Sequence, residues 1–246
     1  VANYKTPVSI VRDAPSDLRN PENRADYILI THGDFYTVAQ TLADYRTNQG
    51  LQAMVVDVQD IYDEFSAGIR DPEGIHSFLA HAYETWQTPA PSYVLLMGDG
   101  TFDPKDNFGW GEPTFIPPYL AEVDPWLGQT AADNRYVCVS GDDQLPDMWL
   151  GRLSVGSLQE AVEVVAKVIE YEQAPSITDW NNQLLFVADN ADSAGDFAAE
   201  SDAVAESHIP SPYTYDRVYY LVTHNSRSSA RSAIRDAINQ GRLIVN

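Results

Sequence analysis

Short apolar segments of strand length alternate with amphipathic helical segments in the first hundred residues, and this alternation restricts the fold more than any other feature. Continuous apolar runs predict β-strands at 27–31, 52–58 and 93–97. Two helices are predicted between them, one capped by Asp34 and ended by Gly50, the other opened by Asp71. Elements that alternate in this way form right-handed crossovers and a parallel sheet covered on both faces.

The same alternation returns in the last third of the chain. Strands are predicted at 184–188, 217–222 and 243–245, and helices at 197–206 and 226–240. The predicted fold class is therefore α/β, with two parallel-sheet subdomains packed side by side. We place the boundary near Pro175, so that residues 1–175 form the first subdomain and residues 176–246 form part of the second, whose sheet is incomplete within this chain.

A loop rich in glycine, proline and tryptophan, from 98 to 128, separates the two patterns. Two short strands are predicted after it, at 136–140 and 148–150. A helix predicted at 158–171 links the halves, and Ser157 with Glu160 forms a capping-box pair at its start. Helical spacing predicts its buried stripe as Leu158, Val162, Val165 and Ile169.

Composition and motifs exclude several partners. The chain has 36 acidic residues against 15 basic ones, and its formal net charge is −21. Such a surface repels nucleic acid and anionic membranes, because both are bound through clustered Lys and Arg. Within residues 1–246 we expect no transmembrane helix and no signal peptide. Three roles fit the acidic residues, namely solubility, calcium binding and attraction of a cationic substrate.

The single cysteine, Cys138, excludes an internal disulfide and a zinc site built from several cysteines. A cysteine nucleophile needs an imidazole nearby. Cys138 lies within the alternating segment RYVCVSG, so we interpret it as a small buried side chain in a strand. His76 and His81 are five residues apart on one predicted helix, which places them about 140° apart around its axis, so they do not form a metal pair.

Aspartates follow the predicted strands, at the edge where parallel sheets bind ligands. Asp99 and Asp103 follow the third predicted strand, and Asp189 follows the first strand of the second half. Asp142 and Asp143 lie in the turn SGDDQLPD. Because carboxylates on loops suit calcium, Asp99, Asp103, Asp142 and Asp143 are candidate ligands of a structural calcium ion. Aspartate is also an ordinary turn residue, and that alternative stays open.

Four stretches of the chain carry a family resemblance. They are YVLLMGDG at 93–100, the segment from ADNRYV through LPDMWLGRL at 132–153, the helix ending in IEYE at 172, and AINQGRLIVN at 237–246. With these stretches the chain resembles the gingipain-like cysteine peptidases, the C25 family of the caspase-like clan. The resemblance implies a caspase-like fold with two α/β subdomains and a cysteine endopeptidase with a Cys-His dyad. In this family the histidine follows the strand that matches GRLIVN, in a Gly-His-Gly motif, and the cysteine comes later, so both are expected beyond Asn246.

The resemblance also implies roles for residues within the chain. Asp189, with Asn190 next to it, matches the place of an acidic group that orients the catalytic histidine. Asp202, or alternatively Asp196, matches a pocket aspartate of arginine-specific relatives, which implies a cationic residue before the scissile bond. No cofactor is required, and calcium in relatives supports the acidic loops as metal sites. The implied localisation is secreted or cell-surface, in a bacterium or archaeon.

Two alternatives to the endopeptidase stay open. The chain fits a non-catalytic binding or scaffold module with a peptidase-like fold, and it also fits a sortase-like transpeptidase. The expected partners are a protein or peptide substrate and the remaining part of the same polypeptide. The strand predicted at 243–245 supports the latter, because a central strand with an open side needs a neighbour.

Overall fold

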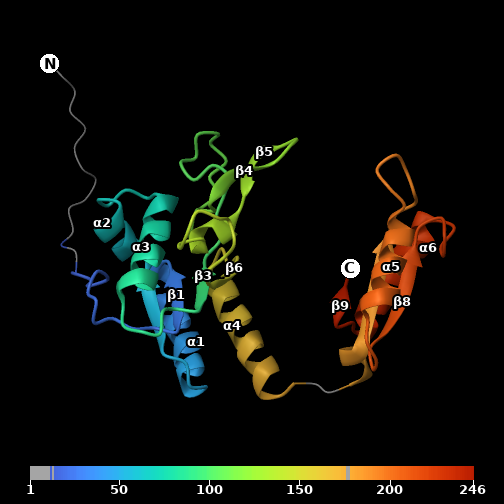
Figure 1. Ribbon diagram of the computed structural model, residues 1–246, viewed down its shortest axis with the longest axis horizontal. Helices are drawn as coiled ribbons and strands as arrows, with labels where there is room; N and C mark the ends of the chain where they lie inside the picture. Colours follow the sequence, from blue (N-terminus) through green and yellow to red (C-terminus); the bar gives the residue numbers. More distant parts are fainter. Residues whose placement is uncertain (1–11, 13, 176–177) are drawn as a thin grey trace. The chain divides into compact units, whose positions relative to one another are not determined.

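The computed structural model describes residues 12, 14–175 and 178–246. The chain divides into two compact units, Val1–Gln173 and Ala174–Asn246, within two residues of the predicted boundary. Each unit is built on its own parallel sheet (Figure 1). No helix within the described residues is long and apolar enough to cross a bilayer.

The first unit contains a four-stranded parallel sheet in the order β2-β1-β3-β6. Its strands are β1 (Tyr27–Thr31), β2 (Ala53–Asp57), β3 (Tyr93–Met97) and β6 (Trp149–Leu153). The register is even, since Tyr27 lies opposite both Ala53 and Tyr93, and Tyr93 lies opposite Trp149. β6 is therefore an edge strand that follows β3 in space although more than fifty residues separate them in the chain.

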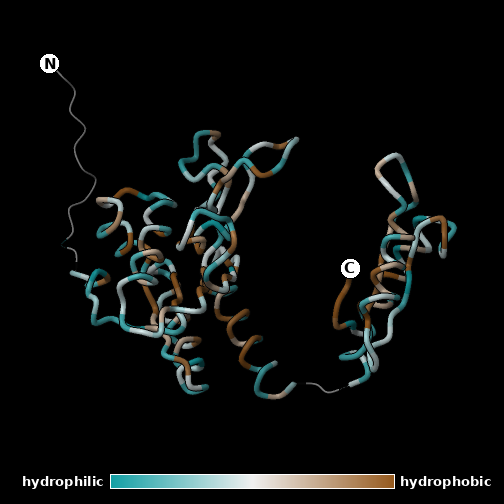
Figure 2. Tube along the Cα trace, in the orientation of Figure 1, coloured by the Kyte–Doolittle hydropathy of each residue, from teal (hydrophilic) through white to brown (hydrophobic). Residues whose placement is uncertain are grey.

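Alternate side chains of these strands face two separate hydrophobic cores. Ile28, Ile30 and Leu96 pack against α2 (Val58–Phe65) and α3 (Pro72–Thr85) on one face. Leu29 and Met97 pack against α1 (Tyr36–Asn48) and α4 (Leu158–Gln173) on the other. Figure 2 shows the hydrophobic stretches along these central strands. The even alternation follows from the two-residue period of a strand, which sends neighbouring side chains to opposite faces.

Aspartates cap two helices of this unit, of which the sequence predicted one, at Asp71. Asp57 caps α2 by accepting from the Gln59 N–H at 2.9 Å, and Asp71 caps α3 by accepting from the Glu73 N–H at 3.0 Å. The prediction that Asp34 caps α1 is wrong. Asp34 lies inside the 3-10 helix η1 (Gly33–Phe35), and its own N–H donates to the ring of His32. The extra turn moves the cap of α1 from Asp34 to Phe35, so that the helix begins at Tyr36.

The middle of the chain differs most from the prediction. The strand predicted at 136–140 is absent, because residues Asp133–Val137 form the 3-10 helix η2 and Asp147 accepts from the N–H groups of Val139 and Ser140 at 2.8 Å. These local bonds replace a strand ladder. Part of the predicted loop instead forms a hairpin of β4 (Leu120–Asp124) and β5 (Gly128–Ala131).

The predicted buried stripe of α4 is also partly wrong. Ala161 and Val165 are buried, whereas Leu158 is 53% and Val162 is 46% exposed. Because apolar residues occupy more of this helix than one face can bury, spacing alone did not decide which face meets the sheet. The predicted cap is present, since the Glu160 N–H donates to Ser157 Oγ at 3.3 Å, and the Glu160 carboxylate accepts from the Gly156 N–H at 2.7 Å.

The second unit has a three-stranded parallel sheet in the order β8-β7-β9. The strands are β7 (Gln183–Ala188), β8 (Thr214–Tyr219) and β9 (Ile244–Val245), and the 3-10 helix η3 (Asp179–Asn182) precedes β7. Leu184 and Phe186 face α5 (Phe197–His208), and Leu185 and Val218 face α6 (Arg227–Gln240). β8 ends three residues before the predicted end, because Tyr219 turns away through bonds to Thr223.

Candidate functional site

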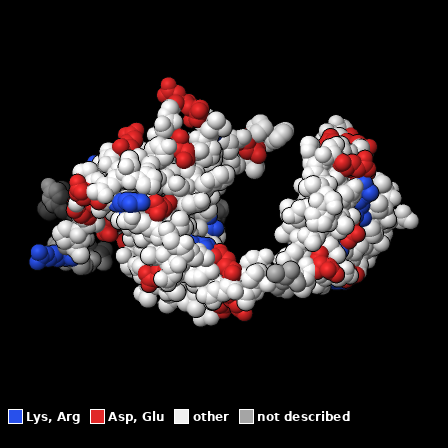
Figure 3. All heavy atoms as spheres, turned by 60° about the horizontal axis from the view of Figure 1, so that its bottom comes forward, with Lys and Arg blue, Asp and Glu red and all other residues white. Residues whose placement is uncertain are grey.

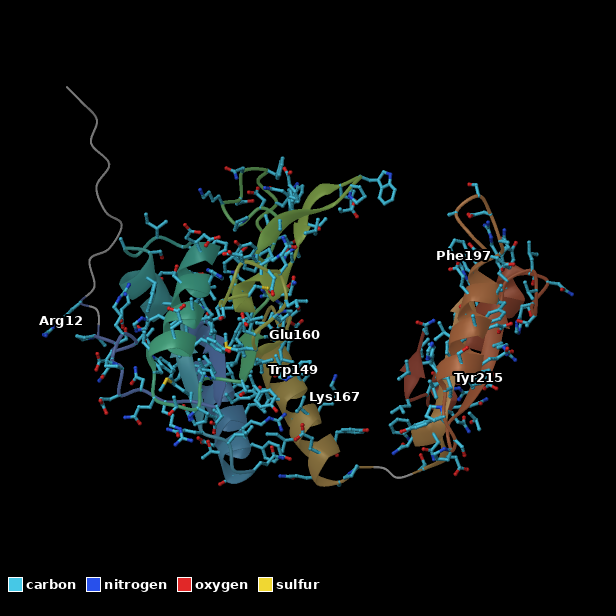
Figure 4. All side chains as sticks on the ribbon, in the orientation of Figure 1. Arg12, Trp149, Glu160, Lys167, Phe197 and Tyr215 are labelled. Atoms are coloured by element: carbon cyan, nitrogen blue, oxygen red, sulfur yellow. The ribbon has the colours of Figure 1, made fainter. Side chains whose placement is uncertain are left out.

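The carboxyl end of the second sheet carries two residues that the sequence singled out. Asp189 and Asn190 follow β7, and Phe197 at the start of α5 marks this end in Figure 4, with Tyr215 toward the opposite end. Asp189 is exposed, and its Oδ1 accepts from the Asn190 N–H at 2.8 Å. Its Oδ2 has no hydrogen bond within the described part of the chain. One carboxylate oxygen thus remains available to a partner.

Strand β9 runs toward this same end. Its ladder continues past Val245, because the Asn246 N–H donates to Leu185 O at 2.9 Å and the Val187 N–H donates to Asn246 O at 2.7 Å. Ile244 lies opposite Leu184 and Val245 opposite Leu185, so Asn246 lies opposite Phe186. A residue three positions beyond Asn246 would lie opposite Asp189 if the strand continued in register. This geometry directs any following residues to the side of Asp189.

Asp202 and Asp196, the two candidates for a substrate pocket, both make contacts within the unit. Asp202 Oδ1 accepts from Arg217 Nε at 2.6 Å and from the Tyr219 hydroxyl at 2.8 Å. Burial and the bond to Asp202 raise the pKa of Tyr219 to about 12, so the hydroxyl stays protonated as a donor at neutral pH. Asp196 caps α5 by accepting from the Ala199 N–H at 3.1 Å. Their predicted substrate role stays a prediction.

The four candidate calcium ligands lie in turns of the first unit. Asp99 Oδ1 accepts from the Gly100 N–H at 2.9 Å, and Asp143 Oδ1 accepts from the Leu145 N–H at 2.9 Å. Asp103 is buried, and bonds from the Phe108 N–H and Asn107 outweigh the opposing effect of burial, so the pKa of its carboxyl is lowered. No group of three His, Cys, Asp or Glu side chains able to hold a metal lies in the described ranges. Calcium at Asp99, Asp103, Asp142 or Asp143 stays a prediction.

Cys138 does not lie in a strand. It follows the 3-10 helix η2, its side chain is partly exposed, and its Sγ donates to Asn134 O at 3.2 Å. His76 lies in the same shallow pocket, but its Nε2 is bonded to the main-chain oxygen of Cys138 at 3.2 Å, and that contact requires the ring nitrogen to donate. The imidazole is therefore not placed to take the thiol proton. The predicted buried position of Cys138 in a strand is wrong in both respects, while the conclusion that it is no nucleophile fits the geometry.

A larger pocket, of about 630 Å³, lies beside the edge strand β6. Its charged side chains, those of Asp133, Asp147 and Arg152, are occupied within the fold. Arg152 donates to Asp133 at 2.7 Å and to the main-chain oxygens of Gly98 and Ile116 at 2.8 and 3.0 Å. Asp147 holds the two main-chain N–H groups described above. Size alone therefore does not make this pocket the candidate site.

Comparison with known proteins decides the family. The sequence model of peptidase family C25 matches residues 20–246. The chain belongs to peptidase family C25. Gingipain R2 of Porphyromonas gingivalis is 26% identical to this C25 chain over 204 residues, which are 82% of the chain and 24% of gingipain R2. Gingipain R1 of the same species has the same identity over 18% of its length, so the C25 chain spans a quarter or less of these relatives.

Two solved structures share the fold of the C25 chain. Dimeric latent PorU from Porphyromonas gingivalis has a TM-score of 0.53 and 26% identity, over 61% of this chain and 16% of PorU. A second structure, described as that of a protease, has a TM-score of 0.59 at 19% identity, over 86% of this chain and 42% of the other. The α/β architecture with parallel sheets and the caspase-like fold predicted from the sequence are confirmed.

The structure also places residues at the candidate site that sequence reasoning missed. Asp189 and Asn190 line a pocket of about 360 Å³ together with residues of β8 and α6. Two arginines of α6, Arg227 and Arg231, are part of its wall. The available signal was their spacing of four residues on a predicted helix, which places them on one face. Figure 3 shows acidic side chains over much of the face it draws, with few basic ones among them, as the net charge of −21 implies.

Proposed function

We propose that this chain forms part of a cysteine endopeptidase in which the carboxylate of Asp189 orients the catalytic histidine. Membership of a peptidase family supports the reaction class. The histidine takes the proton of the cysteine thiol, and the thiolate attacks the carbonyl carbon of a peptide bond. The amine leaves with a proton from the histidine, and water hydrolyses the resulting acyl-enzyme. Both reacting side chains are expected beyond Asn246.

The observation that carries this proposal is the direction of β9. Its ladder with β7 reaches Asn246 and leads toward the carboxyl end of the sheet, where Asp189 lies. A histidine placed just after this strand would come beside a carboxylate with a free oxygen. Such a carboxylate fixes the tautomer of the imidazole and stabilises its charged form.

Preference for a cationic residue before the scissile bond is a finer part of the proposal. It depends on Asp202 or Asp196. Each carboxylate already accepts a hydrogen bond within the unit, Asp202 from Arg217 and Asp196 from the Ala199 N–H, so these contacts do not favour one over the other. Asp202 Oδ2 has no hydrogen bond within the described part of the chain, which leaves one oxygen for a substrate guanidinium or ammonium group. We further propose that the full protein is secreted or exposed at the cell surface, and that any bound calcium is structural.

The proposal is tested with the full-length protein and a library of fluorogenic peptides. We expect cleavage that alkylation of the thiols abolishes. Cleavage that survives alkylation would exclude a cysteine peptidase. Absence of cleavage of every peptide, with the protein folded, would favour the non-catalytic scaffold. Addition of an amine acceptor separates hydrolysis from transpeptidation, because only a transpeptidase forms the amide product in place of the free acid.

A further inference from the structure

The pocket beside Asp189 has a cationic wall. It lies between α6 and the carboxyl ends of β7 and β8, with a volume of about 360 Å³. Val187, Ala230 and Ile234 give it an apolar floor, and Tyr220, Arg227 and Arg231 add polar groups. The Tyr220 hydroxyl has no hydrogen bond to any described residue. A pocket of this size holds a side chain or a chain end rather than a single water molecule.

Arg227 and Arg231 are unpaired within the described part of the chain. The other three arginines of the second unit all have carboxylate neighbours, Arg217 at 2.6 Å from Asp202, Arg242 at 2.6 Å from Asp216 and Arg235 at 4.0 Å from Asp236. In a chain of net charge −21, carboxylates are abundant, yet none is placed against these two. Asp189 lines the same pocket without an ion pair to either arginine.

Their position on the helix is also unfavourable for stability. Arg227 is the first residue of α6 after the capping Ser226, and no acidic residue occupies this first turn. The amino end of a helix carries a partial positive charge, which repels cations. Like charges four residues apart on one face repel each other as well. Packing does not explain the pair, since both side chains are exposed.

We propose that this pocket binds a carboxylate group of a peptide, held between the guanidinium groups of Arg227 and Arg231. Two planar guanidinium forks suit a carboxylate, and the Tyr220 hydroxyl adds a donor. The carboxylate belongs either to an acidic side chain or to a free carboxyl terminus. This inference rests on the proposed peptidase function only in taking the ligand to be a peptide. It implies that an acidic group of the substrate is recognised at the edge of the sheet that carries Asp189.

The test measures peptide binding to the full-length protein after thiol alkylation, so that peptides are bound and not cut. Four labelled peptides share one sequence. In the first pair both ends are blocked, and one peptide has an internal Glu where the other has Gln. In the second pair both peptides have Gln, and one ends in a free carboxylate where the other ends in an amide. We expect the Glu peptide or the free-acid peptide to bind at least tenfold more tightly than its neutral match. Which of the two does so identifies the source of the carboxylate.

Variants assign the effect to the pocket. In Arg227→Gln with Arg231→Gln, the tenfold preference should disappear while the neutral peptides bind as before. The matched control is Arg235→Gln, an exposed arginine on the same helix that does not line the pocket, and it should keep the preference. If the double variant fails to fold, the variant Arg227→Lys with Arg231→Lys takes its place. It retains both positive charges and loses the planar guanidinium groups, so the preference for the acidic peptide should fall without disappearing. Equal binding of acidic and neutral peptides, or equal loss in the control, would overturn the proposal.

Cleavage by the untreated protein separates the two proposals. Arginine-dependent binding of acidic peptides without cleavage of any peptide supports the pocket and contradicts the peptidase. Thiol-dependent cleavage at the same rate for acidic and neutral peptides, and at an unchanged rate in the double variant, supports the peptidase and contradicts the pocket.

Discussion

The main-chain N–H of Val187 donates a 2.7 Å hydrogen bond to the carbonyl oxygen of Asn246, and this bond joins the carboxyl-terminal end of β7 to Asn246. It shows that the parallel ladder of β9 continues beyond the two residues of the strand itself. The path of the backbone at Asn246 is thereby fixed relative to Asp189. The proposed catalytic role of Asp189 depends on this relationship more than on any other.

Replacement of Asp189 tests that role directly. In the full-length protein, Asp189→Asn should lower kcat by between about 10² and 10⁴ fold with a small change in KM, because an amide no longer favours the required imidazole tautomer and its charged form. The control is Asp192→Asn in the same loop, where the carboxylate only accepts from the Ala194 N–H at 2.7 Å. Equal activity of the two variants would remove Asp189 from the mechanism.

Arg152→Lys should destabilise the first unit by roughly 2–3 kcal/mol. The Arg152 guanidinium joins Asp133 to the main-chain oxygens of Gly98, Ile116 and Pro117, and an ammonium group cannot reproduce this fork. Urea unfolding followed by tryptophan fluorescence measures the change. Arg235→Lys, an exposed arginine of α6, is the control and should change the free energy of unfolding by less than about 0.5 kcal/mol. Matching values for both variants would contradict this assignment.

Glu172→Gln should cost about 1 kcal/mol, because two hydrogen bonds of 2.6 and 2.8 Å join Glu172 on α4 to Arg46 on α1. The hydrogen bond from Arg46 lowers the pKa of Glu172. The contribution is therefore present above the ordinary glutamate pKa and is lost as the pH falls through the lowered value. Thermal unfolding between pH 7 and pH 3 should show a difference from wild type that narrows on acidification. Exposed Glu170 provides the control substitution, Glu170→Gln, and a loss of stability there as large as at Glu172 would count against the pairing.

The turn of the β4–β5 hairpin should open at low pH. Asp124 Oδ1 accepts from the N–H groups of Leu127 and Trp126, both at 2.7 Å, and these bonds lower the pKa of its carboxyl. These hydrogen bonds hold the turn at a pH above the ordinary aspartate pKa. They are lost as the pH falls through the lowered pKa of Asp124. The amide NMR signals of Trp126 and Leu127 should move together with a midpoint below about 3.9. A higher midpoint, or the same titration in Asp124→Asn, would contradict this account.

The sequence predicted the parallel sheets well because their strands are short apolar runs such as Tyr27–Thr31 and Tyr93–Met97, buried on both faces. The hairpin strands LAEVD and GQTA were missed, since they bury little and have no clear alternation. The strand predicted around Cys138 was lost to side-chain bonds from Asp147, a residue seven or more positions away that no local pattern points to. Local patterns therefore fail where distant side chains satisfy the main chain.

The candidate site was predictable in part. Asp189 was one of several aspartates named because strand ends of parallel sheets gather functional groups, and the family resemblance singled it out among them. Arg227 and Arg231 were not named, because a charged helix face is most often only solvated, and their lack of partners becomes visible only when every ion pair around them is known. Asp202 was named from the sequence, but its bonds to Arg217 and Tyr219, which join α5 to β8, are seen only in the structure.

The most direct test of the cysteine peptidase is to label its catalytic thiol with a peptide-directed alkylating reagent. The full-length protein is treated with a peptidyl chloromethyl ketone, from which a thiolate displaces chloride to form a stable thioether, and the modified residue is mapped by mass spectrometry. We predict one adduct, on a cysteine that follows Asn246, with slower formation in Asp189→Asn. An adduct confined to Cys138, or none on the folded protein, would contradict the account.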